Sequence, residues 1–356
     1  MRVDPEALQY SIKSDEVQQQ QQFQQCHFDQ IDFAVARFEN CLFEDCRFTK
    51  VDLRQSLFYQ CQFKRCQFID SDLESSQWLS SQLEHCQFHQ TDLSQNQWLQ
   101  STWRDCDLTE SRLEHASFEN SQLNTISFKQ CQLLHLIFFA CELQQCHSEN
   151  CFTERLGLHK TLLKPFPFTE NNLSKMLFAE CDLSHLNLNS VNLSMTQFMN
   201  CNLSHLQAPN ANLQQTNFCG CDLSYARLNS CLGTGVLFAG TILLEADLRN
   251  SQLDQASFQG AQLQKAQLQQ CNLQMSQFTG ANLQGARLDQ AELTYADLSH
   301  AQLQQAVLAG CELTRCNLHH IQTEDTDWQG ANRKDALPTD ERRLKAELWQ
   351  PPPPKQ

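Results

Sequence analysis

The 356-residue sequence lacks an apolar run of 18 or more residues, so it predicts no membrane span. Its first residues lack the basic and then apolar segments of a secretory signal, which favours a cytoplasmic location, with secretion without a cleaved signal as the alternative. A basic stripe is also missing, because the net charge of −15 divides into −2 over residues 1–22, −8 over 23–172, −7 over 173–330 and +2 over 331–356. Direct binding of nucleic acid through its phosphates is therefore not expected.

The sequence also lacks a recognisable catalytic group of nucleophile, base and orienting residue. Gly233-Thr234-Gly235 has no Lys-Ser/Thr end of a phosphate-binding loop. His115 with His135, and His185 with His205, are expected to form stacked surface pairs, but two ligands are too few for a structural metal site. The sequence thus predicts no enzyme, no metal site and no cofactor.

What the sequence does have is a period of five. From Phe23 to Trp328 every fifth residue is Leu, Phe or Trp, with five departures in 62 positions. Five matches neither the helix period nor the strand period, so each group of five residues, or pentad, is expected to stack on its neighbours. This pattern predicts an all-β solenoid. The departures are Ser148, Thr153, Ala208, Gly233 and Thr323.

A second period, four pentads long, lies on top of the first. Phe or Trp recurs at every fourth pentad from Phe38 to Phe138 and again from Phe178 to Phe278. Four pentads therefore make one square coil, and strands stacked about 4.8 Å apart would give about 15 coils and a rod about 70 Å long. Glycines share this spacing, which predicts a positive φ at one corner of every coil. They are Gly220, Gly240, Gly260 and Gly280.

Within a pentad, positions are numbered from the central Leu, Phe or Trp. The residue at minus two is small or thin, and the remaining three are mainly polar. The centre and minus-two side chains are expected to fill a narrow interior that leaves no cavity for a ligand. Eighteen of the 19 cysteines are at minus two, which predicts reduced packing thiols and no disulfide or zinc site.

Stretches such as Ala281-Asn282-Leu283-Gln284-Gly285 and Ala296-Asp297-Leu298-Ser299-His300 resemble the A(D/N)Lxx signature of pentapeptide-repeat proteins. The resemblance covers about residues 23 to 332, although the first half has Phe centres and Cys at minus two. It implies the right-handed quadrilateral β-helix of that family. It also implies two activities of bacterial relatives, which are imitation of duplex DNA at a type II topoisomerase and a role in a secretion apparatus.

The expected organisation has five parts. They are an N-terminal capping segment at 1–22, the first part of the β-helix at 23–143, an irregular coil or extruded loop at 144–172, the second part of the β-helix at 173–332, and a C-terminal helix with a Pro-rich tail at 333–356. Short terminal helices are expected because Asp4-Pro5-Glu6 and Pro338-Thr339-Asp340 resemble helix starts.

The C-terminal helix would carry Leu344, Leu348 and Trp349 on one side. Three roles are open for this end of the chain. The helix could fold back as a lid over the last coil, it could pair with a second copy in a homodimer instead of a monomer, or the proline tail could be a ligand for another protein.

Interruptions of the repeat are where specific contacts are expected, because loops carry much of the recognition on rigid scaffolds. The centres weaken between residues 144 and 171, where prolines also occur. Smaller breaks at Ala208-Pro209 and Gly233 are expected to be bulged corners. The predicted partner-binding residues are His147, Glu149, Glu154, Arg155, His159, Lys160, Pro165 and Pro167.

Three functions fit these features. The first is a non-enzymatic acidic scaffold that binds a protein partner through its β-helix faces. The second is a DNA-mimicking modulator of a type II topoisomerase, with gyrase protection and quinolone resistance, and the third is an effector or accessory protein of a secretion apparatus. Duplex DNA carries one charge per 1.7 Å or so, about 40 over such a rod, against −15 for this chain. The scaffold is therefore preferred.

Overall fold

The computed structural model describes residues 9–10, 16–164 and 172–349. Backbone contacts divide the chain into unit 1, Met1–Asp182, and unit 2, Leu183–Gln356. The expected start of an N-terminal helix and the Pro-rich tail lie outside the described residues. The two units are treated separately below.

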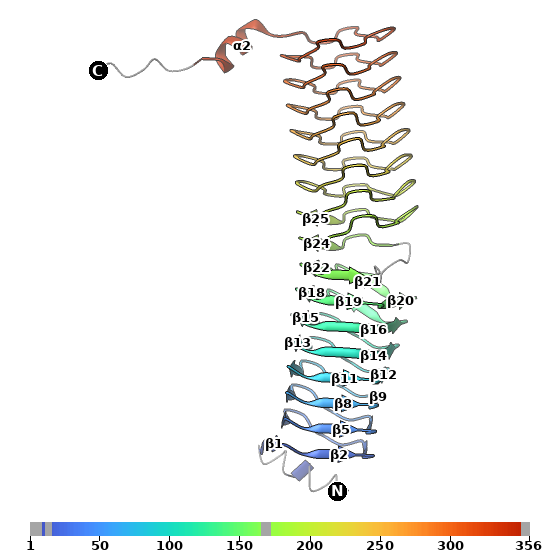
Figure 1. Ribbon diagram of the computed structural model, residues 1–356, viewed down its shortest axis with the longest axis vertical. Coiled ribbons are helices and arrows are strands. Elements are labelled where there is room, and N and C mark those ends of the chain that lie inside the picture. The colour runs from blue at the N-terminus through green and yellow to red at the C-terminus, as the bar shows by residue number, and fades with distance from the viewer. Residues whose placement is uncertain (1–8, 11–15, 165–171, 350–356) are drawn as a thin grey trace, which may run out of the picture. The chain divides into compact units, whose positions relative to one another are not determined.

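Unit 1 is a β-solenoid in which each strand pairs in parallel with the strand one coil, or four pentads, later (Figure 1). Every coil therefore has four sides. Side 1 contains β1 (Gln18–Gln19), β4 (Arg37–Glu39), β7 (Leu57–Tyr59), β10 (Gln77–Leu79), β13 (Gln97–Leu99), β15 (Ser117–Glu119), β18 (Ile137–Phe139), β22 (Gly157–His159) and β24 (Leu177–Ala179).

Sides 2 and 3 are joined where two longer strands turn the corner between them, β14 (Thr102–Thr109) and β16 (Gln122–Lys129). Side 2 also contains β2 (Gln22–Gln24), β5 (Leu42–Glu44), β8 (Gln62–Lys64), β11 (Gln82–Glu84), β19 (Glu142–Gln144) and β23 (Leu162–Lys164). Side 3 contains β3 (His27–Asp29), β6 (Arg47–Thr49), β9 (Gln67–Ile69), β12 (Gln87–His89) and β20 (His147–Glu149). Side 4 consists of single bridges from Asp32↔Asp52 to Arg112↔Gln132, followed by β17 (Gln132–Leu134) and β21 (Phe152–Glu154).

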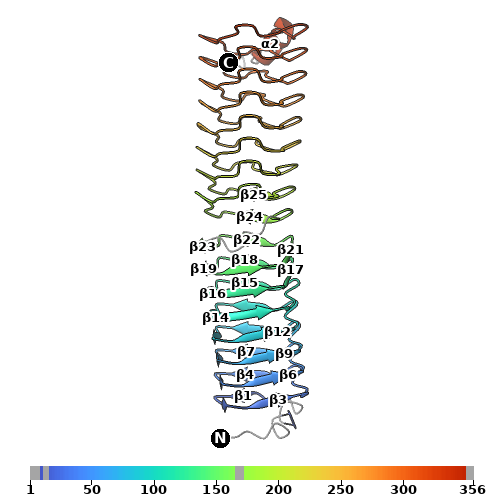
Figure 2. The same ribbon diagram turned by 90° about the vertical axis from the view of Figure 1, so that its right-hand side faces the viewer.

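Unit 2 keeps the same four-pentad register with less strand. Apart from β25 (Gln197–Met199), each pentad contributes one bridged residue and a two-residue turn, and parallel bridges run from Asn187↔Gln207 to Asn317↔Leu337 (Figures 1 and 2). The chain then forms helix α2 (Glu341–Glu347). No helix within the described ranges has the length and apolar character of a membrane span. The handedness of the coils and their total number stay predictions.

The columns of aromatic side chains, one ring per coil, are confirmed inside both units. In unit 2 the rings of Phe198 and Phe218 stack with centroids 5.0 Å apart, and those of Phe218 and Phe238 with centroids 5.3 Å apart. In unit 1 Phe38 and Phe58 stack at 5.4 Å. All five side chains are at most 2% exposed. Burial of such rings is the main favourable term in coils whose outward positions are polar.

The prediction of one positive φ per coil was too narrow. Positive φ occurs at every described plus-two position from 20 to 335, so all four corners of a coil are left-handed. Gly220 and its column take part, with φ of 71° at Gly220, but side chains occupy most corners, for example Gln55 at 58° and Asn210 at 58°. Asn, Asp and His tolerate this conformation better than other residues with a Cβ.

The minus-two side chains also satisfy backbone carbonyls in the interior. The thiol of Cys61 donates to the carbonyl of Phe38 (3.3 Å), and the hydroxyl of Ser101 donates to the carbonyl of Trp78 (2.9 Å). At tight turns a backbone N–H donates to the interior carbonyl instead, as where the N–H of Ala226 donates to the carbonyl of Leu223. Alanine is therefore sufficient at minus two in such turns.

The predicted bulges at Ala208-Pro209 and Gly233 are wrong, because both stretches keep the register of the coils. Ala208 and Gly233 are at centres, and their corners fall two residues later as elsewhere. A Cβ added to Gly233 would lie 2.8 Å from Cδ2 of Leu253 in the next coil, so a neighbouring side chain occupies the space that a large centre would fill.

All 19 cysteines lie within the described residues as thiols. Seventeen of them are buried, and Cys151 and Cys219 are half-buried. Burial raises the pKa of Cys141 to about 11 and that of Cys231 to about 12, so these thiols are protonated at neutral pH. Protonated, enclosed thiols behave as small packing residues.

Replacing Phe218 with Asp tests the dry interior of unit 2. The change removes a stacked ring and leaves an unpaired carboxylate inside, so we expect a loss of at least about 3 kcal/mol of unfolding free energy. Urea denaturation followed by circular dichroism measures it, with Gln214→Asp at an exposed position as the control. Equal unfolding midpoints for the two variants would contradict a dry interior.

Thiol labelling tests the burial of the cysteines. Native protein should react quickly with a disulfide reagent at Cys151 and Cys219 only, whereas all 19 thiols should react in denaturant. Replacing Cys151 and Cys219 with Ser should abolish the fast phase. Fast reaction of many thiols in the native protein would show that the interior is open.

Candidate functional site

The outward side chains of side 1 in unit 1 are more apolar than the repeat requires. Outward positions are mainly polar elsewhere, but side 1 carries Leu, Ile, Tyr and Phe directly before and after its centres. Tyr59, Ile137, Phe139 and Leu177 are 38–48% exposed, and the others are half-buried. We name this set the side 1 apolar face, and its members are Leu57, Tyr59, Leu79, Leu99, Ile137, Phe139 and Leu177.

Strand register brings these side chains into lines along the sheet. Tyr59 pairs with Leu79, and Leu79 pairs with Leu99, so their side chains follow one another from coil to coil. Glu119 separates Leu99 from Phe139 in the same line. The sequence analysis missed this face, although sorting the outward residues by their place in the four-pentad period would have found it.

One end of the side 1 apolar face is polar. The ring of His159 lies 4.8 Å from that of Phe139, and Nε2 of His159 lies 3.2 Å from Oε1 of Glu180. Nζ of Lys160 is 3.3 Å from Oε2 of the same carboxylate. Hydrogen bonds from His159 and then from Lys160 lower the pKa of Glu180. Exposed pairs of this kind add little stability, but they set the charge beside the apolar face.

The predicted partner-binding residues do not form one cluster. The part of segment 144–172 that the structure describes continues the coil in register to Lys164, so its outward residues fall on successive sides. His147 and Glu149 are on side 3, Glu154 is on side 4 with Arg155 at the following corner, and His159 is on side 1 with Lys160 at its corner. Pro165 and Pro167 lie outside the described residues.

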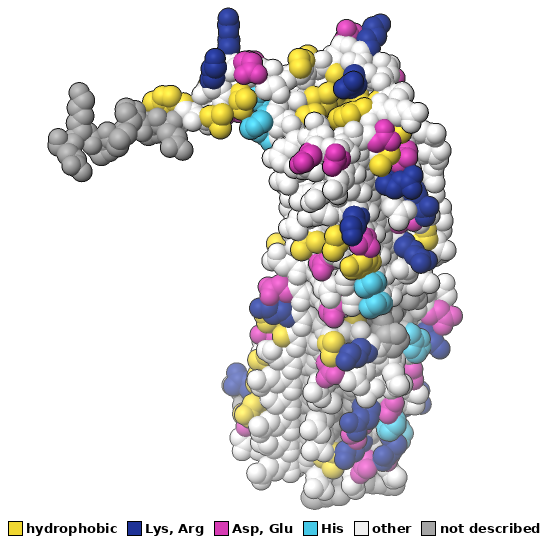
Figure 3. All heavy atoms as spheres, turned by 45° about the horizontal axis from the view of Figure 1, so that its top comes forward, with side chains coloured by type: hydrophobic (Ala, Val, Ile, Leu, Met, Phe, Trp, Pro, Cys, Tyr) yellow, Lys and Arg dark blue, Asp and Glu magenta, His cyan; other side chains and the backbone are white. Residues whose placement is uncertain are grey.

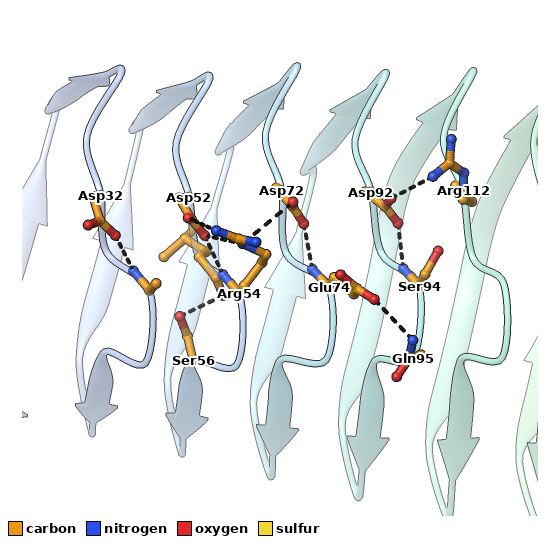
Figure 4. A network of polar contacts seen from close by, with 12 residues as sticks. Asp32, Asp52, Arg54, Ser56, Asp72, Glu74, Asp92, Ser94, Gln95 and Arg112 are labelled. Carbon is orange, nitrogen blue, oxygen red and sulfur yellow. Dashed lines mark hydrogen bonds and ion pairs between the residues drawn. The ribbon is translucent and has the colours of Figure 1, made fainter.

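A column of aspartates follows side 4 of unit 1 (Figure 4). Asp32, Asp52, Asp72 and Asp92 are bridged from one coil to the next, and each accepts a hydrogen bond from the N–H two residues later. Arg54 lies 2.6 Å from Asp52 and 3.7 Å from Asp72. Its hydrogen bond lowers the pKa of Asp52. The column is therefore partly neutralised by arginine.

Both predicted histidine pairs are stacked on the surface. Ring centroids are 4.5 Å apart for His115 and His135, and 4.7 Å apart for His185 and His205. The sequence analysis missed a third pair with the same spacing, His300 and His320.

At this third pair, Glu347 of helix α2 adds a third ligand group, and the three groups lie close enough for one metal ion. These residues could hold one ion, so the absence of a metal site stays a prediction.

Helix α2 lies beside the last coils of unit 2 (Figures 1 and 2). Asp340 caps it by accepting hydrogen bonds from the N–H groups of Arg342 and Arg343. Of the predicted capping or dimer residues, Leu344 is half-buried, whereas Leu348 and Trp349 are 65% and 68% exposed. The helix therefore leaves two large apolar side chains in solvent.

Comparison with known proteins places the repeat in a family. The sequence pattern of the pentapeptide repeat region matches residues 18–97, 41–118, 171–248 and 242–328. A search of curated proteins finds no significant match.

Similar solved structures include pentapeptide repeat proteins. HetL, a pentapeptide repeat protein involved in heterocyst differentiation regulation in the cyanobacterium Nostoc sp. strain PCC 7120, is 24% identical over 62% of this chain and 88% of its own, with a TM-score of 0.44. Rfr23 from the cyanobacterium Cyanothece 51142 is 28% identical over 34% of this chain and 63% of its own, with a TM-score of 0.17. QnrB1, a plasmid-mediated fluoroquinolone resistance protein, is 16% identical over 65% of this chain and 85% of its own, with a TM-score of 0.20.

These TM-scores are low, so the assignment does not depend on them. It depends on the repeat pattern, which matches most of the chain, and on the regular register of the coils. The chain belongs to the pentapeptide-repeat family.

Proposed function

We propose that the protein is a non-enzymatic scaffold that binds a protein partner through the side 1 apolar face of unit 1. The observation that carries this proposal is the exposure of large apolar side chains on one side of a solenoid whose other outward positions are mainly polar. Clusters of exposed apolar residues are typical of interaction sites, and Glu119 divides this face into a part at Tyr59, Leu79 and Leu99 and a part at Ile137, Phe139 and Leu177.

The sheet beneath the face favours binding. The strands of side 1 are paired on both edges from β4 to β22, so their backbone is already ordered. Partner binding would then cost little conformational entropy in this protein. Aromatic members such as Tyr59 and Phe139 offer large contact areas with few rotatable bonds.

The polar end of the face supplies selectivity in this proposal. Glu180, His159 and Lys160 form an exposed charged group next to Phe139. Charged groups at the rim of an apolar patch influence the association rate and the choice of partner more than they increase affinity. Two of the predicted partner-binding residues, His159 and Lys160, thus remain part of the proposed site.

A Phe139→Ser variant tests this face in an affinity purification from the native cell, with bound proteins identified by mass spectrometry. We expect recovery of a partner that binds the wild type to fall at least about tenfold, because Phe139 is a large aromatic contact of the face. Phe152→Ser is the matched control, because Phe152 is also an outward Phe but is on side 4. Equal recovery with both variants would count against side 1.

Modulation of a type II topoisomerase is the second candidate. The aspartate column on side 4 favours it, since Asp32, Asp52, Asp72 and Asp92 repeat at one-coil intervals as phosphates repeat along DNA. Arg54 and Arg112 oppose it, because they pair with members of the column. The scaffold proposal does not need these carboxylates.

Gyrase assays separate the two candidates. If the column imitates DNA, micromolar protein should change DNA supercoiling by gyrase or its inhibition by a quinolone. Replacing Asp32, Asp52, Asp72 and Asp92 with Asn should remove that effect on gyrase. The Phe139→Ser variant should keep the effect. If the wild-type protein changed neither the supercoiling rate nor its inhibition by the quinolone, this candidate would be eliminated.

A further inference from the structure

Three side chains converge where helix α2 meets the coils of unit 2. The ligand atoms of His300, His320 and Glu347 all lie within 4.8 Å of one another, and within the described residues they form the one such group that could hold a metal ion. Figure 3 shows histidine side chains in the region where the helix leaves the coils. None of these residues belongs to the side 1 apolar face or to the aspartate column.

The solenoid register positions the two histidines. His300 and His320 occupy the same corner of successive coils, with φ of 59° and 54°. Their rings approach edge to face, with centroids 5.1 Å apart and planes at 74°. They therefore differ from the parallel stack of His185 and His205, whose planes are at 5°. An angled pair can direct two ring nitrogens toward one point, whereas a parallel stack directs them side by side.

Glu347 reaches this pair from the last turn of α2 and is held from two directions. Oε2 lies 3.3 Å from Nε2 of His300 and 3.2 Å from Nε2 of His319, and Oε1 accepts a hydrogen bond from Nε of Arg343 (2.7 Å). His319 is 2% exposed, and its Nδ1 accepts a hydrogen bond from the N–H of Asp340. In its neutral form His319 therefore carries its proton on Nε2 and donates it to Glu347.

We propose that His300, His320 and Glu347 bind a divalent transition-metal ion, with Zn²⁺ as the best fit. Two imidazole nitrogens and one carboxylate oxygen are a ligand set typical of zinc, with a fourth position left for water. Ligands at about 2.1 Å from a tetrahedral ion lie about 3.4 Å from one another. The distance of 3.3 Å between Oε2 of Glu347 and Nε2 of His300 is close to this value, and all three ligand atoms lie within 4.8 Å of one another.

The surrounding groups suit a cation in part. Hydrogen bonds from Arg343 to Oε1 and from His319 to Oε2 hold the carboxylate of Glu347 in place. Arg343 is itself positive, but it contacts Oε1 and leaves Oε2 to the histidine side. His319 is a positioning residue that orients the ligand carboxylate, as partners of metal ligands commonly do.

Metal binding would attach α2 to the coils. The helix has no buried residue, so it has little packing to hold it in place. A shared ion would join Glu347 to two successive coils and would fix the C-terminal end of unit 2.

Calorimetric titration of the full chain with ZnCl₂ tests the site. We expect binding of one ion, with affinity falling at least tenfold in His320→Ala and in Glu347→Gln. His205→Ala is the matched control, because it removes a histidine from a stacked pair with the same spacing and should leave the affinity unchanged. Absence of binding, or equal affinity in all four proteins, would overturn the proposal.

Cobalt spectroscopy distinguishes this site from the cysteines. Co²⁺ bound by two imidazoles and a carboxylate should give visible d–d absorption that disappears in Glu347→Gln. Strong near-ultraviolet absorption from thiolate ligands that persists in this variant would place the ion on cysteines and overturn the proposal.

Proteolysis tests whether a bound ion attaches helix α2 to the coils. Trypsin cleaves α2 after Arg342, Arg343 or Lys345, and Zn²⁺ should slow this cleavage severalfold in the wild type but not in His320→Ala. Equal rates with and without Zn²⁺ in the wild type would show that no ion holds the helix.

Discussion

Parallel pairing between equivalent residues of successive coils is the constraint on which the rest of this structure depends. It places the same pentad position of every coil in one line, so buried rings stack on rings and small residues on small residues. It also puts outward residues into surface columns, whatever their chemistry. The aspartate column, the side 1 apolar face and the histidine pairs all arise in this way.

The interior requires more than small volume at minus two. A carbonyl that points into a dry core needs a donor, because an unpaired buried polar group costs about 1–3 kcal/mol. Strand sides obtain the donor from Cys, Ser or Thr, as where Ser101 donates to Trp78, and turns obtain it from a backbone N–H. The change from Cys and Ser in the first half to Ala in the second accompanies the change from three-residue strands to single bridges.

Features set by the spacing of the buried and paired residues were predicted from the sequence, whereas three others were missed. The stacked phenylalanines, the buried cysteines and the pairs His115–His135 and His185–His205 follow from spacing alone. The number of left-handed corners was underestimated. Gln, His and Asp also adopt a positive φ at plus two, but in a sequence only glycine clearly indicates this conformation. The cluster at His300 was missed since its third member, Glu347, comes from a helix outside the period. The side 1 apolar face was missed because most neighbours within it come from different coils and are far apart in the sequence.

The four-sided coil makes chain length a determinant of surface chemistry. Within either unit, inserting or deleting one whole coil would keep every later side chain on its own side. Inserting or deleting one pentad would move every later side chain to the next side of the coil, although the core would still be filled. Duplication of whole coils would thus lengthen a recognition surface without altering it. Gain or loss of a single pentad would instead turn the downstream surface residues to a different side of the solenoid. Homologues with equally well packed cores can therefore present different residues on the same side.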